Sequence, residues 1–233
     1  MEHLIELRDV FKIYDEGLES EVRALDGVSL TIDRGEFVAI IGQSGSGKST
    51  LMNILGCLDV PTRGEYLLDG ISVGTLTDAQ LSKIRNQQVG FIFQQYHLLP
   101  TLNAVENVEL PLIYQGMDNE TRRATAMAAL ERVGLAARAK NFPKQFSGGQ
   151  QQRIAIARAI SAHPPIVMAD EPTGALDSRT GKEVLAFLRK LNDEGSTVIL
   201  ITHDNSIAAT AKRRIRISDG RIVEDCLQEE APL

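Results

Sequence analysis

A glycine-rich segment follows a short apolar run near the start of the chain. Residues 42–50 read Gly-Gln-Ser-Gly-Ser-Gly-Lys-Ser-Thr, which fits the pattern G-x-x-x-x-G-K-[ST]. Glycines let a backbone turn sharply so that its N–H groups point at phosphate oxygens, and a following helix adds the positive end of its dipole. We expect Lys48 to reach the β- and γ-phosphates of a nucleotide, Ser49 to bind Mg²⁺, and Thr50 to support the phosphates. The other members of this predicted phosphate loop are Gly42, Gln43, Ser44, Gly45, Ser46 and Gly47.

A second glycine pair lies in the middle of the chain, where residues 146–150 read Phe-Ser-Gly-Gly-Gln. Its serine can cap a helix, which we expect to begin near Gln151 or Gln152. On its own the segment fits a plain helix cap. Together with a phosphate loop it favours a second anion site, because the glycines expose backbone N–H groups beside the cap. The residues of this predicted site are Ser147, Gly148, Gly149 and Gln150.

Two adjacent carboxylates end an apolar run at residues 166–171. An isolated pair of this kind is usually a solvated pair of acids at a strand end. In a phosphate-loop enzyme, however, an aspartate here holds Mg²⁺, and we assign this role to Asp170. Glu171 is then placed to polarise a water molecule for attack on the γ-phosphate.

The order of these three motifs resembles that in the ATP-binding subunits of ABC transporters, over residues 4–224. The resemblance implies roles for four further residues. Tyr14 resembles the aromatic residue that stacks on adenine, and Gln94 resembles the glutamine that touches Mg²⁺ and senses the γ-phosphate. Asp177 lies in a segment similar to the D-loop, and His203 resembles the switch histidine. Phe146 stands where the family usually has leucine, and we expect it to pack rather than to bind nucleotide.

The resemblance also implies an assembly. Two subunits would pair head to tail around two Mg-ATP, each nucleotide lying between the phosphate loop of one subunit and residues 147–150 of the other. Hydrolysis, with Lys48, Glu171 and His203 as catalytic residues, would then drive a membrane permease. The expected location is the cytoplasm, peripheral on the inner face of the cell membrane, with membrane contact only through the permease.

Residues 103–112 and 170–178 resemble the lipoprotein-releasing and macrolide-export type of this family. The resemblance implies an exporter of lipoproteins, antimicrobial peptides or macrolides. Two alternatives stay open. One is a cell-division type of ABC ATPase that regulates a membrane partner without transport, and the other is a soluble ABC ATPase that acts on DNA or ribosomes.

The elements that must position these motifs can be read from hydrophobic patterning. Short buried strands alternate with helices, which predicts a parallel sheet. We therefore expect an α/β fold: a P-loop NTPase core with a mostly parallel sheet, an N-terminal antiparallel β subdomain and an inserted α-helical subdomain. The expected strands lie at 28–32, 37–41, 166–169 and 198–201, with hairpins at 66–73 and 214–224. The expected helices include 119–133, with Met127, Leu130 and Val133 on one side, and one ending near Gly195 with Val184, Leu185, Leu188 and Leu191.

A single ABC ATPase domain is expected over residues 1–233. Its predicted parts are 1–93 for the ATP-binding core with the antiparallel β subdomain, 94–162 for the helical subdomain, and 163–233 for the remainder of the core. At this length the chain is about one complete cassette, so we expect the permease on a separate chain.

Composition narrows the function classes. The chain has 31 acidic and 25 basic residues, a net charge of −6, which argues against broad nucleic-acid binding. With 43% hydrophobic residues it should fold, yet no apolar run is long enough to cross a membrane. Its two cysteines are too few for a disulfide framework. The tightest basic cluster, Arg213, Arg214 and Arg216, is expected on a solvated hairpin.

Overall fold

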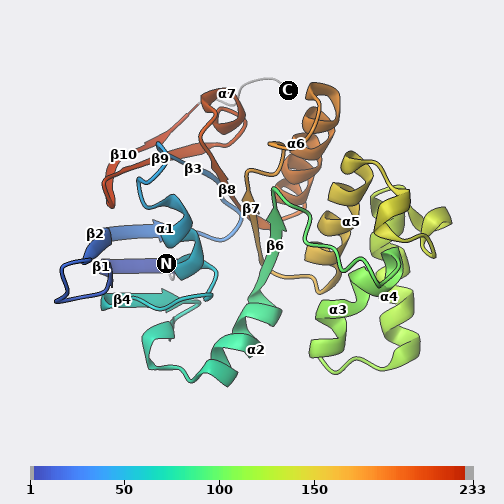
Figure 1. Ribbon diagram of the computed structural model, residues 1–233, viewed down its shortest axis with the longest axis horizontal. Coiled ribbons are helices and arrows are strands. Elements are labelled where there is room, and N and C mark those ends of the chain that lie inside the picture. Colours follow the sequence, from blue (N-terminus) through green and yellow to red (C-terminus); the bar gives the residue numbers. More distant parts are fainter. Residues whose placement is uncertain (1–2, 229–233) are drawn as a thin grey trace. The chain divides into compact units, whose positions relative to one another are not determined.

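The computed structural model describes residues 3–228, which form two compact units. The first unit takes the described residues up to Arg85 and those from Arg189 onward, and the second runs from Asn86 to Leu188. Figure 1 shows the elements of each unit in sequence colours. The subdomain boundaries expected at 93/94 and 162/163 stay predictions.

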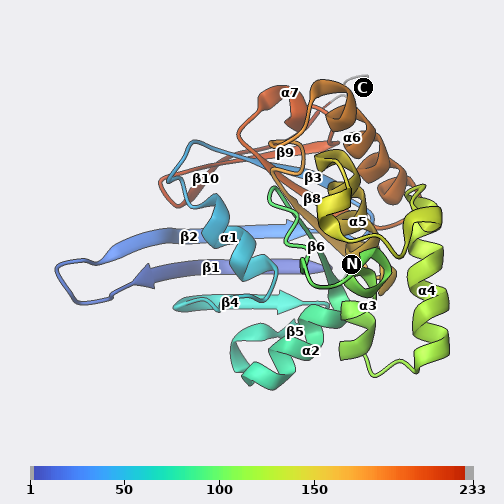
Figure 2. The same cartoon turned by 45° about the vertical axis from the view of Figure 1, so that its right-hand side comes forward.

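The N-terminal strands of the first unit form an antiparallel sheet in the order β2-β1-β4-β5. Figure 2 shows β1, β2 and β4 lying side by side. In β2, Val28, Leu30 and Ile32 are buried, as their alternation with polar residues predicts. The turn between β4 and β5 is Asp69-Gly70, and both residues have positive φ angles, as a tight two-residue hairpin turn requires. The strands are β1 (Ile5–Tyr14), β2 (Val22–Ile32), β4 (Arg63–Leu68) and β5 (Ile71–Ser72).

The remaining strands of the first unit surround β3 (Phe37–Ile41), which pairs in parallel with β8 (Thr197–Thr202) and β9 (Arg213–Ser218). Every residue of β3 and β8 is buried, which explains their continuous apolar sequences. Strand β10 (Arg221–Leu227) completes an antiparallel hairpin with β9. The other elements of this part are α1 (Lys48–Leu55), η1 (Val73–Thr75) and α7 (Asn205–Ala208).

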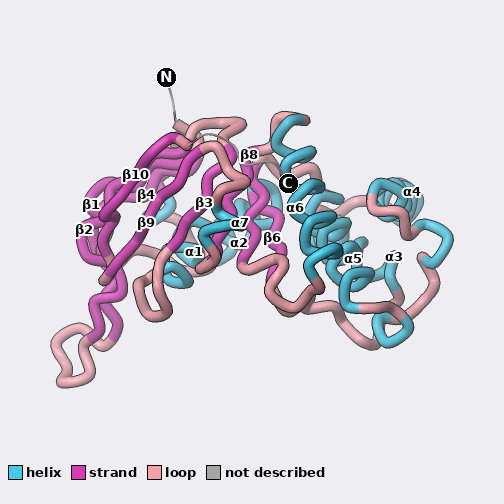
Figure 3. Tube along the Cα trace, turned by 90° about the horizontal axis from the view of Figure 1, so that it is seen from above, coloured by secondary structure: helices cyan, strands magenta, loops and turns pink. Residues whose placement is uncertain are grey.

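The second unit combines a parallel strand pair with helices. Strand β6 (Val89–Phe93) pairs in parallel with β7 (Ile166–Asp170), in a register that sets Phe93 opposite Asp170. Figure 3 shows α3, α4 and α5 gathered together. The helices are α3 (Ala104–Tyr114), α4 (Asn119–Arg132), η2 (Ala136–Arg138), η3 (Pro143–Gln145) and α5 (Gly148–Ser161). Helices α2 (Asp78–Gln88) and α6 (Ser178–Asp193) each contain a point where the chain passes between units.

Two expectations about helices need correction. Helix α5 begins at Gly148 rather than near Gln151, because Ser147 caps it directly and both glycines take part in its first turn. Helix α4 buries Ala126, Ala129 and Leu130, whereas Met127 is only half-buried. In both helices small residues contribute more than the hydrophobic pattern indicates: Gly148 and Gly149 in the first turn of α5, and Ala126 and Ala129 in the buried face of α4.

The basic cluster lies on the β9–β10 hairpin, as expected, but it is half-buried and paired rather than solvated. Arg213 binds Glu36 and Asp225, while Arg214 and Arg216 share Glu224. Hydrogen bonds from Arg214 and then Arg216 lower the pKa of Glu224 to about 2. The arginines therefore stabilise the hairpin instead of forming an open basic patch.

None of the helices within residues 3–228 combines the length and the apolar character needed to span a bilayer.

Candidate active site

The phosphate loop joins β3 to α1, and its glycines are required by close contacts. A Cβ atom at Gly42 would lie 2.4 Å from the carbonyl oxygen of Ile217 and 2.5 Å from the hydroxyl of Ser46. Gly47 has a φ of 103°, and a Cβ there would lie 2.5 Å from the carbonyl oxygen of Ala24. Side chains at either position would displace backbone. Close packing of the backbone therefore accounts for the glycines at positions 42 and 47.

Helix α1 begins without a side-chain cap. Its N-cap is Gly47, which offers no hydrogen-bond acceptor, and its first turn contains no acidic residue. The first N–H groups of a helix lack partners within the helix itself, so this terminus is suited to an anion. The buried hydroxyl oxygen of Ser46 has no hydrogen-bond partner among the described residues. The loop thus presents unused polar groups and partial positive charge.

The side chain of Lys48 lies along the loop. Its Nζ donates hydrogen bonds to the carbonyl oxygens of Gly42 at 2.7 Å and Gln43 at 2.6 Å. Ser49 is exposed and Thr50 is half-buried on the same first turn of α1. The lysine ammonium is therefore held at the loop that the sequence assigned to phosphate binding.

The β9–β10 turn supports the loop, and sequence reasoning missed this. The backbone N–H of Gly220 donates to the carbonyl oxygen of Ser46 at 2.9 Å, and the N–H of Asp26 donates to Gly220 at 2.9 Å. A Cβ atom at Gly220 would lie 2.9 Å from the carbonyl oxygen of Ala24. The Asp219-Gly220 pair was readable as a turn, but nothing in its local sequence indicates this contact.

Tyr14 lies at the end of β1 and keeps 39% of its surface exposed. The ammonium of Lys12 lies 5.3 Å from the centre of the ring, and the same ammonium binds Asp59 at 2.6 Å. The hydroxyl of Tyr14 donates to Asp59 at 3.5 Å. The ring is thus oriented by an ion pair while part of it stays accessible, as base stacking requires.

His203 follows the last residue of β8 and is exposed. Its neighbour Asp204 caps the short helix α7 by accepting hydrogen bonds from the N–H groups of Ser206 and Ile207. The Ser206 hydroxyl, helped by its backbone N–H, lowers the pKa of Asp204. This capped turn fixes the backbone that carries the histidine.

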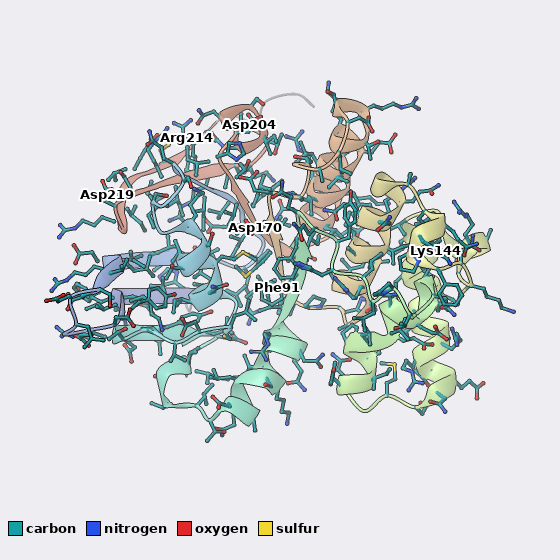
Figure 4. All side chains as sticks on the ribbon, viewed as in Figure 1. Phe91, Lys144, Asp170, Asp204, Arg214 and Asp219 are labelled. Atoms are coloured by element: carbon teal, nitrogen blue, oxygen red, sulfur yellow. The ribbon has the colours of Figure 1, made fainter. Side chains whose placement is uncertain are left out.

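In the second unit, the ends of β6 and β7 bring Gln94 and the two carboxylates to one edge. Gln94 directly follows Phe93, which lies opposite Asp170 in the parallel register. Figure 4 shows Asp170 at the end of β7, with Phe91 on β6. Glu171 has a φ of 43°, which is uncommon for a residue with a side chain. The backbone therefore leaves the extended conformation of β7 at this residue.

The amide of Gln94 also packs on the segment that follows the carboxylates. A Cβ atom at Gly174 would lie 2.7 Å from the Nε2 of Gln94. Further along, Asp177 accepts hydrogen bonds from the N–H groups of Arg179 at 3.1 Å and Thr180 at 3.0 Å. The N–H and then the hydroxyl of Thr180 lower the pKa of Asp177. Asp177 therefore caps α6, in addition to any role toward nucleotide.

The Ser147–Gln150 segment forms a complete capping box at the start of α5. The Ser147 hydroxyl accepts from the N–H of Gln150 at 3.4 Å, and the Gln150 side chain accepts from the N–H of Ser147 at 3.1 Å. Gln150 also accepts from Arg138 at 2.9 Å, and the Arg138 guanidinium lies 4.4 Å from the centre of the Phe146 ring. Phe146 is buried, which agrees with the expectation that it packs.

Gly148 and Gly149 lie against side chains to which the sequence analysis assigned no role. A Cβ atom at Gly148 would lie 2.6 Å from the Tyr96 hydroxyl, and one at Gly149 would lie 2.4 Å from the Cγ2 of Thr180. Tyr96, Arg138 and Thr180 thus support this segment. Their residue types give no local signal of that role, because the contacts arise only in the folded unit.

The predicted site residues thus fall into two sets. Tyr14, residues 42–50 and His203 belong to the first unit, and Gln94, residues 147–150, Asp170, Glu171 and Asp177 belong to the second. Within each set the structure places the residues at strand ends and helix N-termini.

Comparison with known proteins identifies the family of this chain. Residues 25–174 match the family described as ABC transporter. A macrolide export ATP-binding/permease protein of Rhodospirillum rubrum is 57% identical over 222 residues, which is 95% of this chain and 34% of the relative. A pyoverdine export ATP-binding/permease protein of Pseudomonas fluorescens is 56% identical over 97% of this chain and 35% of its own length. The chain thus spans about a third of the length of the curated relatives it matches.

Solved structures agree with this relationship. A dimeric post-hydrolysis state of the ATP-binding cassette MJ0796 with ADP and Pi has a TM-score of 0.88 and 47% identity. It covers 97% of this chain and 99% of the solved chain. A second dimeric structure of MJ0796, a bacterial ABC transporter cassette, also has a TM-score of 0.88, at 49% identity. The expected cassette fold is confirmed, and the chain belongs to the ABC transporter family as an ATP-binding, ATPase cassette.

Proposed function

We propose that this cassette hydrolyses Mg-ATP in a head-to-tail homodimer and so drives a membrane permease of the exporter class. The observation that carries the proposal is the N-terminus of α1. It is uncapped, it is built on glycines that nothing else can replace, and it holds Lys48 beside it. This combination is a phosphate site that needs an external anion.

In the proposed site, the N–H groups of residues 42–50 donate to phosphate oxygens. Lys48 donates hydrogen bonds to the β- and γ-phosphates, in place of or in addition to those that it donates to the carbonyl oxygens of Gly42 and Gln43. Its ammonium stabilises the negative charge that develops during phosphoryl transfer. Thr50 supports the phosphates, and Tyr14 stacks on adenine.

The proposed metal ligands are the hydroxyl of Ser49, the amide of Gln94 and the carboxylate of Asp170, with Asp170 acting through water. All three offer hard oxygen atoms, which suit Mg²⁺, and one carboxylate beside substrate phosphates is the usual arrangement. When bound, the ion offsets phosphate charge. Glu171 polarises the attacking water, and His203 contacts the γ-phosphate side of the site.

The second half of each site is proposed to come from a partner subunit. The chain has one phosphate loop and one Ser147–Gln150 segment. The relatives of known structure are dimers, and one of them carries ADP and Pi. We infer that Ser147, Gly148, Gly149 and Gln150 close on the nucleotide in trans, with Asp177 beside them.

The permease partner and the export role rest on the relatives, whose names state macrolide export and pyoverdine export. The proposal holds for a permease on a separate chain, as the sequence predicts, and equally for one in the same polypeptide. It places the cassette at the inner face of the cell membrane through that permease. We propose no contact with nucleic acid.

Nucleotide binding and hydrolysis of two variants test the site. We expect Lys48→Ala to lose both, and Glu171→Gln to keep ATP binding while its hydrolysis falls by about 10²–10⁴-fold. Lys83→Ala, an exposed lysine of α2, is the matched control and should behave like the wild type. Hydrolysis by Lys48→Ala at the wild-type rate would contradict the assignment.

A further inference from the structure

A pocket of about 320 Å³ lies within the second unit, between the end of α4, the middle of α5 and the first half of α6. None of the residues assigned to nucleotide, metal or the partner subunit lines it. Its volume falls at the lower end of the range for small-molecule sites, roughly 300–1,000 Å³. It is therefore large enough for a small organic ligand and is separate from the proposed ATP site.

The walls of this α4–α5–α6 pocket are largely apolar. Val133, Ile156 and Val184 are buried, and the half-buried ring of Phe187 adds an aromatic surface. The hydrophobic part of a ligand bound here would be buried together with these side chains, and this burial of apolar surface favours binding. The shape and lining thus favour a ligand with a hydrophobic part.

One charged residue that lines the pocket, Arg153, lacks a partner among the described residues. The Nε of Arg153 is buried, and no hydrogen bond or ion pair of this arginine lies within the described part of the chain. Three other arginines, Arg122, Arg189 and Arg214, also have a buried Nε without a hydrogen bond, but each of them donates through another nitrogen. Arg153 therefore differs from them, because its whole guanidinium has no hydrogen bond or ion pair among the described residues and so can bind an external acceptor through its terminal nitrogens.

The charge of the lining points to an anion. Arg153 is a cation without a hydrogen bond or ion pair among the described residues, and it lines the pocket together with one acid, Glu183. Glu183 already pairs with the exposed Arg179 at 3.6 Å. A guanidinium presents a planar fork of donors that matches carboxylate, sulfonate and phosphate oxygens. We propose that the α4–α5–α6 pocket binds a small organic anion with an apolar body, whose acidic group is held by Arg153.

The pocket also adjoins the segments assigned to nucleotide in trans. Arg153 lies one turn beyond Gln150 on α5, and Thr180 both lines the pocket and contacts Gly149. Thr180 in turn binds Asp177 through its N–H and its hydroxyl. An occupant would restrain these residues and alter ATP hydrolysis, an effect that rests on the proposed function. Binding itself does not rest on it.

Calorimetric titration with 2-naphthalenesulfonate tests the proposal, with neutral 2-naphthalenesulfonamide as the isosteric comparison. Saturating ADP is present throughout, so that the probe does not report on the phosphate loop. We expect one anion site per chain and binding of the sulfonate at least about tenfold tighter than of the sulfonamide, because a charged group gains a guanidinium partner. Equal affinity for the two probes, or no binding of either, would overturn the proposal.

Variants locate the site. Arg153→Gln should weaken sulfonate binding by about tenfold or more and leave sulfonamide binding unchanged. Phe187→Ala should weaken both probes, which keeps the test decisive if Arg153→Gln does not fold. Lys144→Gln, an exposed cation of the same unit labelled in Figure 4, should bind both as the wild type does. Wild-type sulfonate affinity in a folded Arg153→Gln, or in Phe187→Ala, would place the probe elsewhere and overturn the assignment.

Discussion

The N-termini of α1 and α5 both lie in segments that combine serine and glycine, yet their caps differ. At α1 the N-cap is a glycine without an acceptor, and the lysine that follows folds back on the loop carbonyls. At α5 the N-cap is Ser147, and a capping box with Gln150 satisfies the N–H groups of Ser147 and Gln150 but does not include those of Gly148 and Gly149. The α1 terminus thus has no side-chain cap, whereas the α5 terminus is partly satisfied by its own side chains.

This difference explains how one nucleotide can join two subunits. The phosphate loop is held rigidly by backbone contacts to Ala24 and Gly220, so its polar groups are already arranged when a nucleotide arrives. The α5 terminus is capped without nucleotide, and it can contact the nucleotide bound to a second subunit when the two subunits close. We therefore expect changes at α1 to affect binding first, and changes at α5 to affect dimerisation first.

The largest effect is expected from Gly47→Ala. Its φ of 103° alone costs about 1–3 kcal/mol for a residue with a side chain, and the added Cβ meets the Ala24 carbonyl at 2.5 Å. We expect loss of nucleotide binding together with lower unfolding free energy, measured by urea denaturation. Gly35→Ala is the matched control, because it has a φ of 77° but nothing within 4 Å of the new Cβ. If the two variants are equally stable and both bind ATP, the loop is not held as described.

A smaller effect on stability is expected at Ser147, where two substitutions separate capping from ligand contact. Ser147→Ala removes the cap and should lower unfolding stability by about 1 kcal/mol. Ser147→Asp keeps an acceptor at the cap, so its stability should match the wild type, but its negative charge opposes the phosphates of a partner-bound nucleotide. We expect this variant to bind ATP as a monomer and to fail in ATP-dependent dimerisation, as measured by light scattering. A Ser147→Asp protein that dimerises normally would remove this residue from the proposed site.

The smallest effect is expected from Asp177, whose contribution to the unfolding free energy depends on pH. The pKa of its carboxyl is lowered in the folded chain, first by the backbone N–H of Thr180. The carboxylate therefore stabilises the fold above its ordinary pKa of 3.8, and this contribution is lost as pH falls from there through the lowered value. We expect Asp177→Asn to be slightly less stable than wild type at pH 6, with the difference shrinking toward pH 2 in denaturant titrations. If the difference in unfolding free energy between Asp177→Asn and wild type instead grew as the pH fell, the pKa of Asp177 would not be lowered by folding.

Much of this site could be predicted because its motifs are local. The phosphate loop, the carboxylate pair and the capped glycine segment each occupy consecutive residues, and hydrophobic runs correctly located β3, β7 and β8. The roles assigned to those residues remain proposals. The predicted start of α5 lies about three residues late, because the capping box outweighs the low helix propensity of Gly148 and Gly149 and includes both in the first turn.

The rest could not be predicted, because it depends on contacts between distant residues. Gly220 supports the phosphate loop, Tyr96 packs on Gly148, and the arginines of the final hairpin bind Glu36, Glu224 and Asp225. Sequence spacing carries no record of these pairs. The unpartnered Arg153 likewise becomes visible only when the pocket around it is formed.

The central claim is that each half-site in one chain needs the other half from a second chain. The most direct test is light scattering after size-exclusion chromatography of Glu171→Gln, without nucleotide and with saturating Na-ATP in the absence of Mg²⁺. We expect the mass of one chain without nucleotide and the mass of two chains with ATP. A chain that stays monomeric with ATP demonstrably bound would contradict it.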